Sequence, residues 1–341
     1  MSARSAVDLG IGEKPGAPAA GAARAAPALR PRSGLAGWLR QFIDRNGWLL
    51  ASYIVLAVTF WVLVLIVLPQ LVMLDFSLRL DLPPARQGGP EDVWTLANYR
   101  YFLFGFPGNP DAWNYVDLAV FARTLVAAMF VTVFDLAICY PIAYYLAQSA
   151  QGQTARILAV ALVVPYWVNE ILRAFAFRII FGSGGLINAT LQALGLTDQP
   201  IDFIRANVAL YAGLGYAYVL LMIFPIYNAI ESLDRNQIEA ARDLGASWWR
   251  IHRRVVIPFA KPGITSGCTM VFMLSAGALA APQILGGPSS LWFTQIIYRT
   301  FFESVNWPRG AAYAVILLVT CTALVLLAMR LFRVRLGEIG R

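Results

Sequence analysis

The sequence has few charged residues, a single histidine, two lysines and three cysteines among its 341 residues. Charged residues make up 13% of the chain and hydrophobic residues 59%, whereas a soluble domain carries about 25% charged residues. The chain therefore lacks the charges that a surface facing water on all sides requires. With His252 as its only histidine, it cannot build a site on two imidazoles, and we expect this side chain at the level of lipid headgroups.

Catalytic and metal-binding patterns are also absent from the sequence. Cys139, Cys268 and Cys321 lie in apolar runs without metal-ligand spacing, so we expect them to be small packing residues. The sequence contains neither H-E-x-x-H nor G-x-S-x-G. No catalytic residue and no metal ligand is therefore predicted, which argues against an intramembrane enzyme.

Six long apolar segments follow a start that is rich in Ala, Gly and Pro. They cover residues 46–74, 118–147, 157–181, 206–230, 262–298 and 310–329. A membrane-spanning helix needs about 20 mostly apolar residues, and the fifth segment is long enough to include a re-entrant or external piece as well. We predict an all-α membrane protein with six transmembrane helices, formed by residues 46–341 after a disordered cytoplasmic tail over residues 1–45.

The distribution of Lys and Arg predicts the orientation. In a six-span arrangement, 18 of the 27 basic residues fall on one side, in the tail, the loop after the second span, the segment 231–261 and the C-terminus. By the positive-inside rule, both termini are expected in the cytoplasm. Topology thus accounts for the net charge of +8, and we expect a lipid bilayer rather than a nucleic acid as the partner. The aromatic-rich segment 75–117 is expected on the outside, either at the interface or as a folded cap.

The cytoplasmic segment 231–261 carries the most specific motif. Glu239, Ala240 and Ala241 are followed after three residues by Gly245, and nine residues later by the sequence V-V-I-P, which ends at Pro258. This order predicts a short helix, a break and a second helix that runs into the fifth span. Gly245 can adopt a positive φ and end the first helix, and a helix bends or restarts at a proline.

The faces of this short helix can also be predicted. Ile238, Ala241 and Leu244 are expected to form one apolar stripe, and Glu239 is expected to face away from it. On these residues alone, the segment could also be an ordinary amphipathic loop on the membrane surface.

This motif resembles the EAA motif of ATP-binding cassette (ABC) importer permeases, with its spacing kept in full. The resemblance implies the type I importer (MetI-like) fold in a bacterial inner membrane, and a coupling role toward an ATPase subunit for Glu239, Ala240, Ala241, Gly245 and Pro258. It also implies four further components: two cytoplasmic ATPase subunits, a second permease subunit that is expected to form a heterodimer with this chain, and a periplasmic solute-binding protein. The chain has no G-x-x-x-x-G-K-[ST] loop, so ATP and magnesium are expected on the ATPase subunits and no cofactor on this chain.

Other patterns are similar to the spermidine/putrescine branch of these permeases, in particular Pro165-Tyr166-Trp167 and the sequence L-R-A-F-A over residues 172–176. This similarity implies import of a polyamine by alternating access. Permeases for opines, amino-acid derivatives or iron(III) share parts of these patterns and remain alternatives. A stand-alone secondary transporter is a weaker alternative, because no internal inverted repeat is visible.

Charged and polar residues inside the apolar segments are candidates for a substrate pathway. Asp135 lies within the second segment, and Asn169 and Glu170 lie within the third, next to Tyr166 and Trp167. Such residues are costly in lipid and so face a partner or a water-filled path. Carboxylates and aromatic faces suit a cationic substrate. Alternatively, Glu170 could simply pair with Arg173 one helical turn away.

Overall fold

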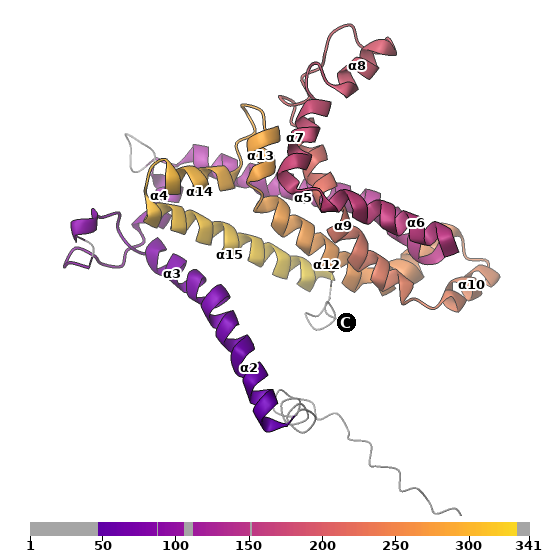
Figure 1. Ribbon diagram of the computed structural model, residues 1–341, viewed down its shortest axis with the longest axis horizontal. Helices are drawn as coiled ribbons and strands as arrows, with labels where there is room; N and C mark the ends of the chain where they lie inside the picture. The colour runs from indigo at the N-terminus through magenta and orange to yellow at the C-terminus, as the bar shows by residue number, and fades with distance from the viewer. Residues whose placement is uncertain (1–46, 87, 106–111, 151, 333–341) are drawn as a thin grey trace, which may run out of the picture. The chain divides into compact units, whose positions relative to one another are not determined.

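The computed structural model describes residues 47–86, 88–105, 112–150 and 152–332, and all regular structure in these ranges is helical (Figure 1). The predicted disordered tail, residues 1–45, lies outside the described residues. The chain divides into two compact units, Met1–Val67 and Leu68–Arg341. The described part of the first unit consists of α2 (Trp48–Val62) and the π-helical turn η1 (Leu63–Val67).

The second unit contains the remaining helices. In chain order they are α3 (Leu68–Ser77), η2 (Pro84–Arg86), α4 (Ala97–Phe104), α5 (Tyr115–Tyr144), η3 (Tyr145–Ser149), α6 (Gly152–Val163), η4 (Val164–Trp167), α7 (Glu170–Ile180), α8 (Leu186–Ala193), α9 (Val208–Glu231), α10 (Arg235–Asp243), α11 (Trp248–Ile251), η5 (His252–Val256), α12 (Ile257–Ala276), α13 (Ala280–Leu285), α14 (Phe293–Phe302) and α15 (Trp307–Phe332).

Five helices within the described residues are long and apolar enough to cross a membrane. They are Trp48–Ser77, Tyr115–Ser149, Val208–Glu231, Trp248–Ala276 and Trp307–Arg330. A bent pair, Gly152–Trp167 and Glu170–Ile180, makes a sixth if it is counted as one span, with 95° between its two halves. The all-helical architecture with up to six spans is therefore confirmed.

Two of the predicted segments differ from the helices that form. The third is not one continuous helix, because the backbone breaks at residues 168–169 between η4 and α7. The fifth span begins at Trp248 and ends at Ala276, well before residue 298. The remainder of the predicted fifth segment forms the short helices α13 and α14, as its excess length indicated.

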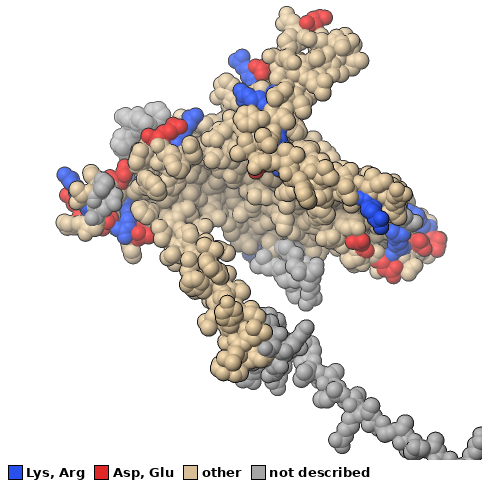
Figure 2. Space-filling model, in the orientation of Figure 1, with Lys and Arg blue, Asp and Glu red and all other residues tan. Residues whose placement is uncertain are grey.

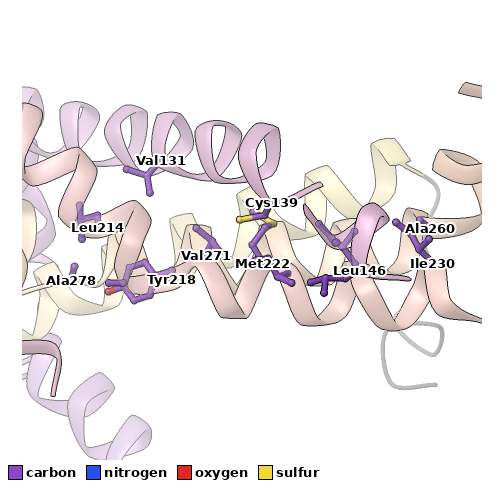
Figure 3. Packing of buried hydrophobic residues seen from close by; sticks show 14 of the residues in the cluster. Val131, Cys139, Leu146, Leu214, Tyr218, Met222, Ile230, Ala260, Val271 and Ala278 are labelled. Carbon is purple, nitrogen blue, oxygen red and sulfur yellow. The ribbon is translucent and has the colours of Figure 1, made fainter. Parts of the chain in front are cut away.

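The main core lies where α5, α9 and α12 pack against one another. Apolar side chains from all three helices meet there (Figure 3). The labelled ones on these helices are Val131, Cys139, Leu214, Tyr218, Met222, Ile230, Ala260 and Val271. Cys139 is fully buried with a free thiol, as expected of a small packing residue.

Gly263 allows α9 and α12 to approach closely. A Cβ atom at this position would lie 2.3 Å from the carbonyl oxygen of Pro225 and 2.6 Å from the Cβ of Ala229, both on α9. No side chain fits at such distances, so a glycine is required where the two backbones meet. This contact holds the helix that follows the segment 231–261 against the centre of the bundle.

A second, smaller core forms around α4, α14 and α15. Phe102, Phe293 and Tyr313 are buried there, with ring centroids 5.5 to 5.8 Å apart. The Tyr313 hydroxyl donates to the carboxylate of Asp117, 2.5 Å away, near the start of α5. Within the described part of the region 75–117, α4 is thus folded against α14 and α15, while Trp94 remains exposed. Whether this region is a cap or lies at the interface stays a prediction.

Charged side chains are unevenly placed on the second unit. On the face shown in Figure 2, they gather over α10 and are sparse along α15. Beyond the end of α3, Arg79 pairs with Asp75 and Asp92 at 2.6 and 2.7 Å. The hydrogen bond that Arg79 donates to the carboxylate of Asp75 raises the pKa of Arg79 above its usual value. A helix that crosses a bilayer needs uncharged sides where it faces lipid, with charged residues near its ends where it meets water.

Candidate functional site

The segment 231–261 forms the two helices that its sequence predicts. Asp234 is the N-cap of α10, and its carboxylate accepts a hydrogen bond of 3.0 Å from the backbone N–H of Asn236. After α10 and a break at residues 244–247, the chain forms α11, η5 and α12 without interruption. Pro258 is the second residue of α12, directly after the π-helical turn, so it stands where the α-helix restarts. A proline is tolerated at such a position because its missing N–H is not needed.

Gly245 ends α10 in a Schellman motif. Its φ is +73°, in the left-handed region that glycine enters without strain. Its N–H donates to the carbonyl of Arg242 at 2.8 Å, and the N–H of Ala246 donates to the carbonyl of Ala241 at 3.0 Å. These two bonds satisfy carbonyls that a helix end would otherwise leave free. Apart from its chain neighbours, a Cβ atom at Gly245 would meet nothing within 4 Å in the described part of the chain, so the space beside it is open there.

The exposed face of α10 differs in part from the predicted one. Ile238 is buried and Ala241 half-buried, and both pack against the main core. Leu244, predicted to share their stripe, is instead 88% exposed. Glu239 and Ala240 are exposed as well. The prediction for Leu244 was wrong because α10 ends at this residue. Leu244 is the C-cap, so the backbone geometry of the helix end, and not the helical period, sets the direction of its side chain.

Beyond the break, the second helix is anchored through His252. This side chain is 2% exposed, and its Nδ1 lies 2.8 Å from the hydroxyl of Tyr140 on α5. The ring also lies 4.1 Å from that of Trp248 and 4.4 Å from that of Tyr144, between centroids. The side chain is therefore packed between helices and not exposed to lipid, and its depth at the level of the headgroups stays a prediction. The sequence did not indicate this contact, because its two partners are more than 100 residues apart.

The pathway candidates of the third segment gather at the helix break. Asn169 is the N-cap of α7, with its side-chain oxygen 2.8 Å from the N–H of Ile171. Tyr166 and Trp167 are 41% and 86% exposed, and Glu170 is exposed in the first turn of α7. Four candidates thus share one short exposed stretch. Their place in the third segment had suggested one continuous helix. Instead, the break between η4 and α7 lies among them.

Glu170 does not form the alternative ion pair with Arg173. Within the described residues no salt bridge joins them, and the Arg173 guanidinium instead lies over the rings of Tyr166 and Tyr216, 5.1 and 6.0 Å from their centroids. Cation–π contacts of this kind partly offset the loss of hydration around the guanidinium. Among the described residues the carboxylate of Glu170 has no salt-bridge partner, so it can meet another cation.

Two other arginines in apolar segments bond to backbone carbonyls. Arg123 of α5 donates to the carbonyls of Ser289 and Leu291, and Arg178 of α7 donates to that of Ile284. These carbonyls lie at the end of α13 and in the loop after it. The cations thus satisfy backbone groups that have no partner within a helix.

Asp135 is separate from the four residues at the break. It is 2% exposed, and it faces Gly215 of α9, where an added Cβ atom would lie 2.7 Å from its Oδ1. Its Oδ2 has no hydrogen-bond partner among the described residues. Asp135 is therefore buried between α5 and α9. The residues at the break contact a different residue of α9, because Arg173 lies over the ring of Tyr216.

A bundle of apolar helices, with an exposed helix–Gly–helix segment that leads into one of them, is the arrangement that the resemblance to membrane permeases of ABC transporters predicts. The sequence matches the family described as binding-protein-dependent transport system inner membrane component over residues 126–336. The chain belongs to this family. It is accordingly a multi-pass protein of the inner membrane and a permease subunit rather than an enzyme.

Several curated proteins are similar over most of the chain. The spermidine/putrescine transport system permease protein PotB of Escherichia coli is 30% identical over 275 residues, which are 80% of this chain and 94% of that protein. The protein of the same name from Salmonella typhimurium is 29% identical over 294 residues, 85% of this chain and 97% of that one. The inner membrane ABC transporter permease protein YdcU of E. coli is 31% identical over 255 residues, 71% of this chain and 76% of that one.

The fold is shared with a solved transporter. A chain from the crystal structure of a bacterial ABC transporter involved in the import of the acidic polysaccharide alginate aligns with a TM-score of 0.64. The alignment covers 87% of this chain and 98% of that one, at 16% identity. The predicted type I importer fold is thereby confirmed.

Proposed function

We propose that this chain is a permease subunit of an ATP-driven importer that moves a polyamine such as spermidine or putrescine into the cytoplasm. The observation that carries the choice of substrate is the similarity to PotB proteins, which extends over at least 94% of the E. coli and Salmonella relatives compared above. Local chemistry supports it. The break before α7 exposes the carboxylate of Glu170 beside Tyr166 and Trp167, and a diammonium compound is bound by carboxylates and aromatic faces together.

The exposed face of α10, formed by Glu239, Ala240 and Leu244, is the surface that we assign to the ATPase. Ala240 has a short side chain and Gly245 stands beside open space, so a partner surface can approach the backbone closely. In this proposal two ATPase subunits hold the ATP and magnesium. A second, distinct permease subunit completes the path, a periplasmic binding protein delivers the substrate, and both termini lie in the cytoplasm.

Motion of α10 would reach the membrane helices through rigid connections. The Schellman motif fixes the angle at which the chain leaves α10. The next helix continues from Trp248 to Ala276 as one span, so a displacement at its start is carried along its length. His252 ties this start to Tyr140 of α5, and Gly263 ties the next turns to α9. Alternating access would then be a movement of α5, α9 and α12 together.

Uptake by the reconstituted importer tests the proposal. Proteoliposomes that contain this chain with its partner subunits and binding protein should accumulate radiolabelled spermidine only when ATP is present inside. An excess of unlabelled putrescine should compete with it, and an uncharged polyol of similar length should not. Accumulation without ATP, or no accumulation of either polyamine by a complex that hydrolyses ATP, would refute it.

A further inference from the structure

A groove runs between α5, α12 and α15, outside the residues assigned to coupling or to the pathway. Its volume is about 550 Å³. Met129 and Phe272 line one end, and Tyr140, Lys261 and Phe332 line the other. The two ends can be distinguished because Tyr140 contacts His252 near the start of the span Trp248–Ala276, whereas Phe272 belongs to the second core.

Nearly all of the wall between these ends is apolar, with side chains such as Val133, Leu136 and Leu324. Thr132, one of its few polar members, donates its hydroxyl proton to the carbonyl of Ala128 in its own helix at 2.8 Å. The wall therefore presents hydrocarbon to whatever occupies the groove. From Lys261 to Phe272 it follows about 16 Å of helix, a length suited to an extended chain rather than to a compact solute.

Lys261 is the cation of this groove. It is exposed, and within the described part of the chain no acidic side chain forms a salt bridge with it. Side chains on a helix tilt toward its N-terminus, so the ammonium group points toward the end of the span where Arg253 and Arg254 are exposed. Arg330 is exposed near the end of α15. One end of an apolar groove is thus cationic and the other is not.

We propose that this groove binds an anionic phospholipid, with the phosphate on Lys261 and an acyl chain along the apolar wall between α5, α12 and α15. The charge complements a phosphate, and basic pockets between membrane helices hold such headgroups. The bound lipid lies in the leaflet on the side of the segment 231–261. There it would contact α12, the helix that this segment leads into, and so the lipid composition would influence coupling.

Native mass spectrometry of the purified full-length chain tests the site. The probes are phosphatidylglycerol and phosphatidylcholine with identical acyl chains. The parent protein should retain phosphatidylglycerol preferentially, and Lys261→Gln should weaken that retention about fivefold, the effect of one basic residue at an anionic surface. Arg235→Gln on α10 removes the same charge away from the groove and should change nothing. Equal retention by Lys261→Gln and the parent, or an equal loss in Arg235→Gln, would overturn the proposal.

A photo-crosslinker identifies the occupant directly. Benzoylphenylalanine at Val133, whose side chain is 58% exposed in the groove wall, should form a product whose added mass is that of a phospholipid. A product with another polypeptide, or with α2 of the same chain, would show that protein fills the groove and would refute the lipid site. Neither experiment depends on the transported substrate, so failure here leaves the proposed function untouched.

Discussion

The hydroxyl of Tyr140 on α5 lies 2.8 Å from Nδ1 of His252, which stands near the start of the span Trp248–Ala276. This bond joins two helices at the point where the segment 231–261 enters the bundle. Because the histidine is 2% exposed, water cannot replace the tyrosine hydroxyl at low cost.

Tyr140→Phe removes the hydroxyl and keeps the ring. We expect it to lower the free energy of unfolding by about 1 to 3 kcal/mol, because a buried ring nitrogen loses its partner. Unfolding of the purified protein by SDS titration measures this. Tyr115→Phe is the matched control, since Tyr115 is 71% exposed. Equal effects of the two substitutions would show that the bond does not stabilise the start of the span.

Gly245→Val should leave the permease inserted and folded but reduce its association with the ATPase. A β-branched residue with positive φ costs about 1 to 2 kcal/mol, and apart from its chain neighbours no atom of the described residues lies within 4 Å of the new Cβ. Co-purification with the ATPase subunit is the measurement.

Gly245→Asn separates strain from bulk at this site. Asparagine enters the left-handed region more readily than valine, so it relieves the strain while still adding a side chain. If Asn restores association, only the backbone conformation matters. If Asn fails as Val does, a partner surface occupies the open space. Normal association and transport by Gly245→Val would remove the support for coupling through this segment.

Glu170→Gln should reduce polyamine uptake about tenfold or more at low substrate concentration, since a hydrogen-bonded charge contributes about 1.5 to 3 kcal/mol. Assembly should be unaffected, because Glu170 is exposed and forms no salt bridge with Arg173 in the described structure. Initial uptake rates against spermidine concentration, alongside the yield of complex, test both points. A poorly assembling Glu170→Gln variant that Arg173→Gln rescues would instead establish the ion pair.

Gly215→Ala should destabilise the bundle by about 1 to 3 kcal/mol, because its Cβ would come within 2.7 Å of the Asp135 carboxylate. Asp135→Ala in the same chain should relieve most of that cost, and the double-mutant cycle gives their coupling energy. Gly184→Ala, where an added Cβ meets nothing within 4 Å, is the control. Additive effects of the two substitutions would show that Asp135 and Gly215 do not touch.

The proposed orientation predicts opposite labelling of two positions. In a chain without its three native cysteines, Pro90→Cys should react with an impermeant thiol reagent added from the periplasm. Trp248→Cys should react only from the cytoplasm. Both side chains are exposed, so access depends on the side of the membrane. Labelling of both from one side would contradict the arrangement of spans.

The sequence by itself determined the features that depend on neighbours along the chain. Lipid tolerates a helix wherever about 20 apolar residues follow one another, so the long apolar segments were found without any knowledge of packing. The helix, break and helix around Gly245 were also predictable, because N-cap, Schellman motif and proline act within a few residues. The cytoplasmic position of the termini and the roles of the candidate residues remain predictions from the sequence.

Tertiary structure alone decided which side chains meet. Arg173 is one turn from Glu170 in sequence, yet it lies over Tyr166 and Tyr216. The burial of His252 against Tyr140 likewise has no local signal. At the break in the third segment, Asn169 is a local helix-start signal, but the angle of 95° between the two halves is a property of the folded chain. The contacts of Arg173 with Tyr216 and of His252 with Tyr140 join helices far apart in the chain, and the local pattern of residues around each side chain does not show which distant side chain it will meet.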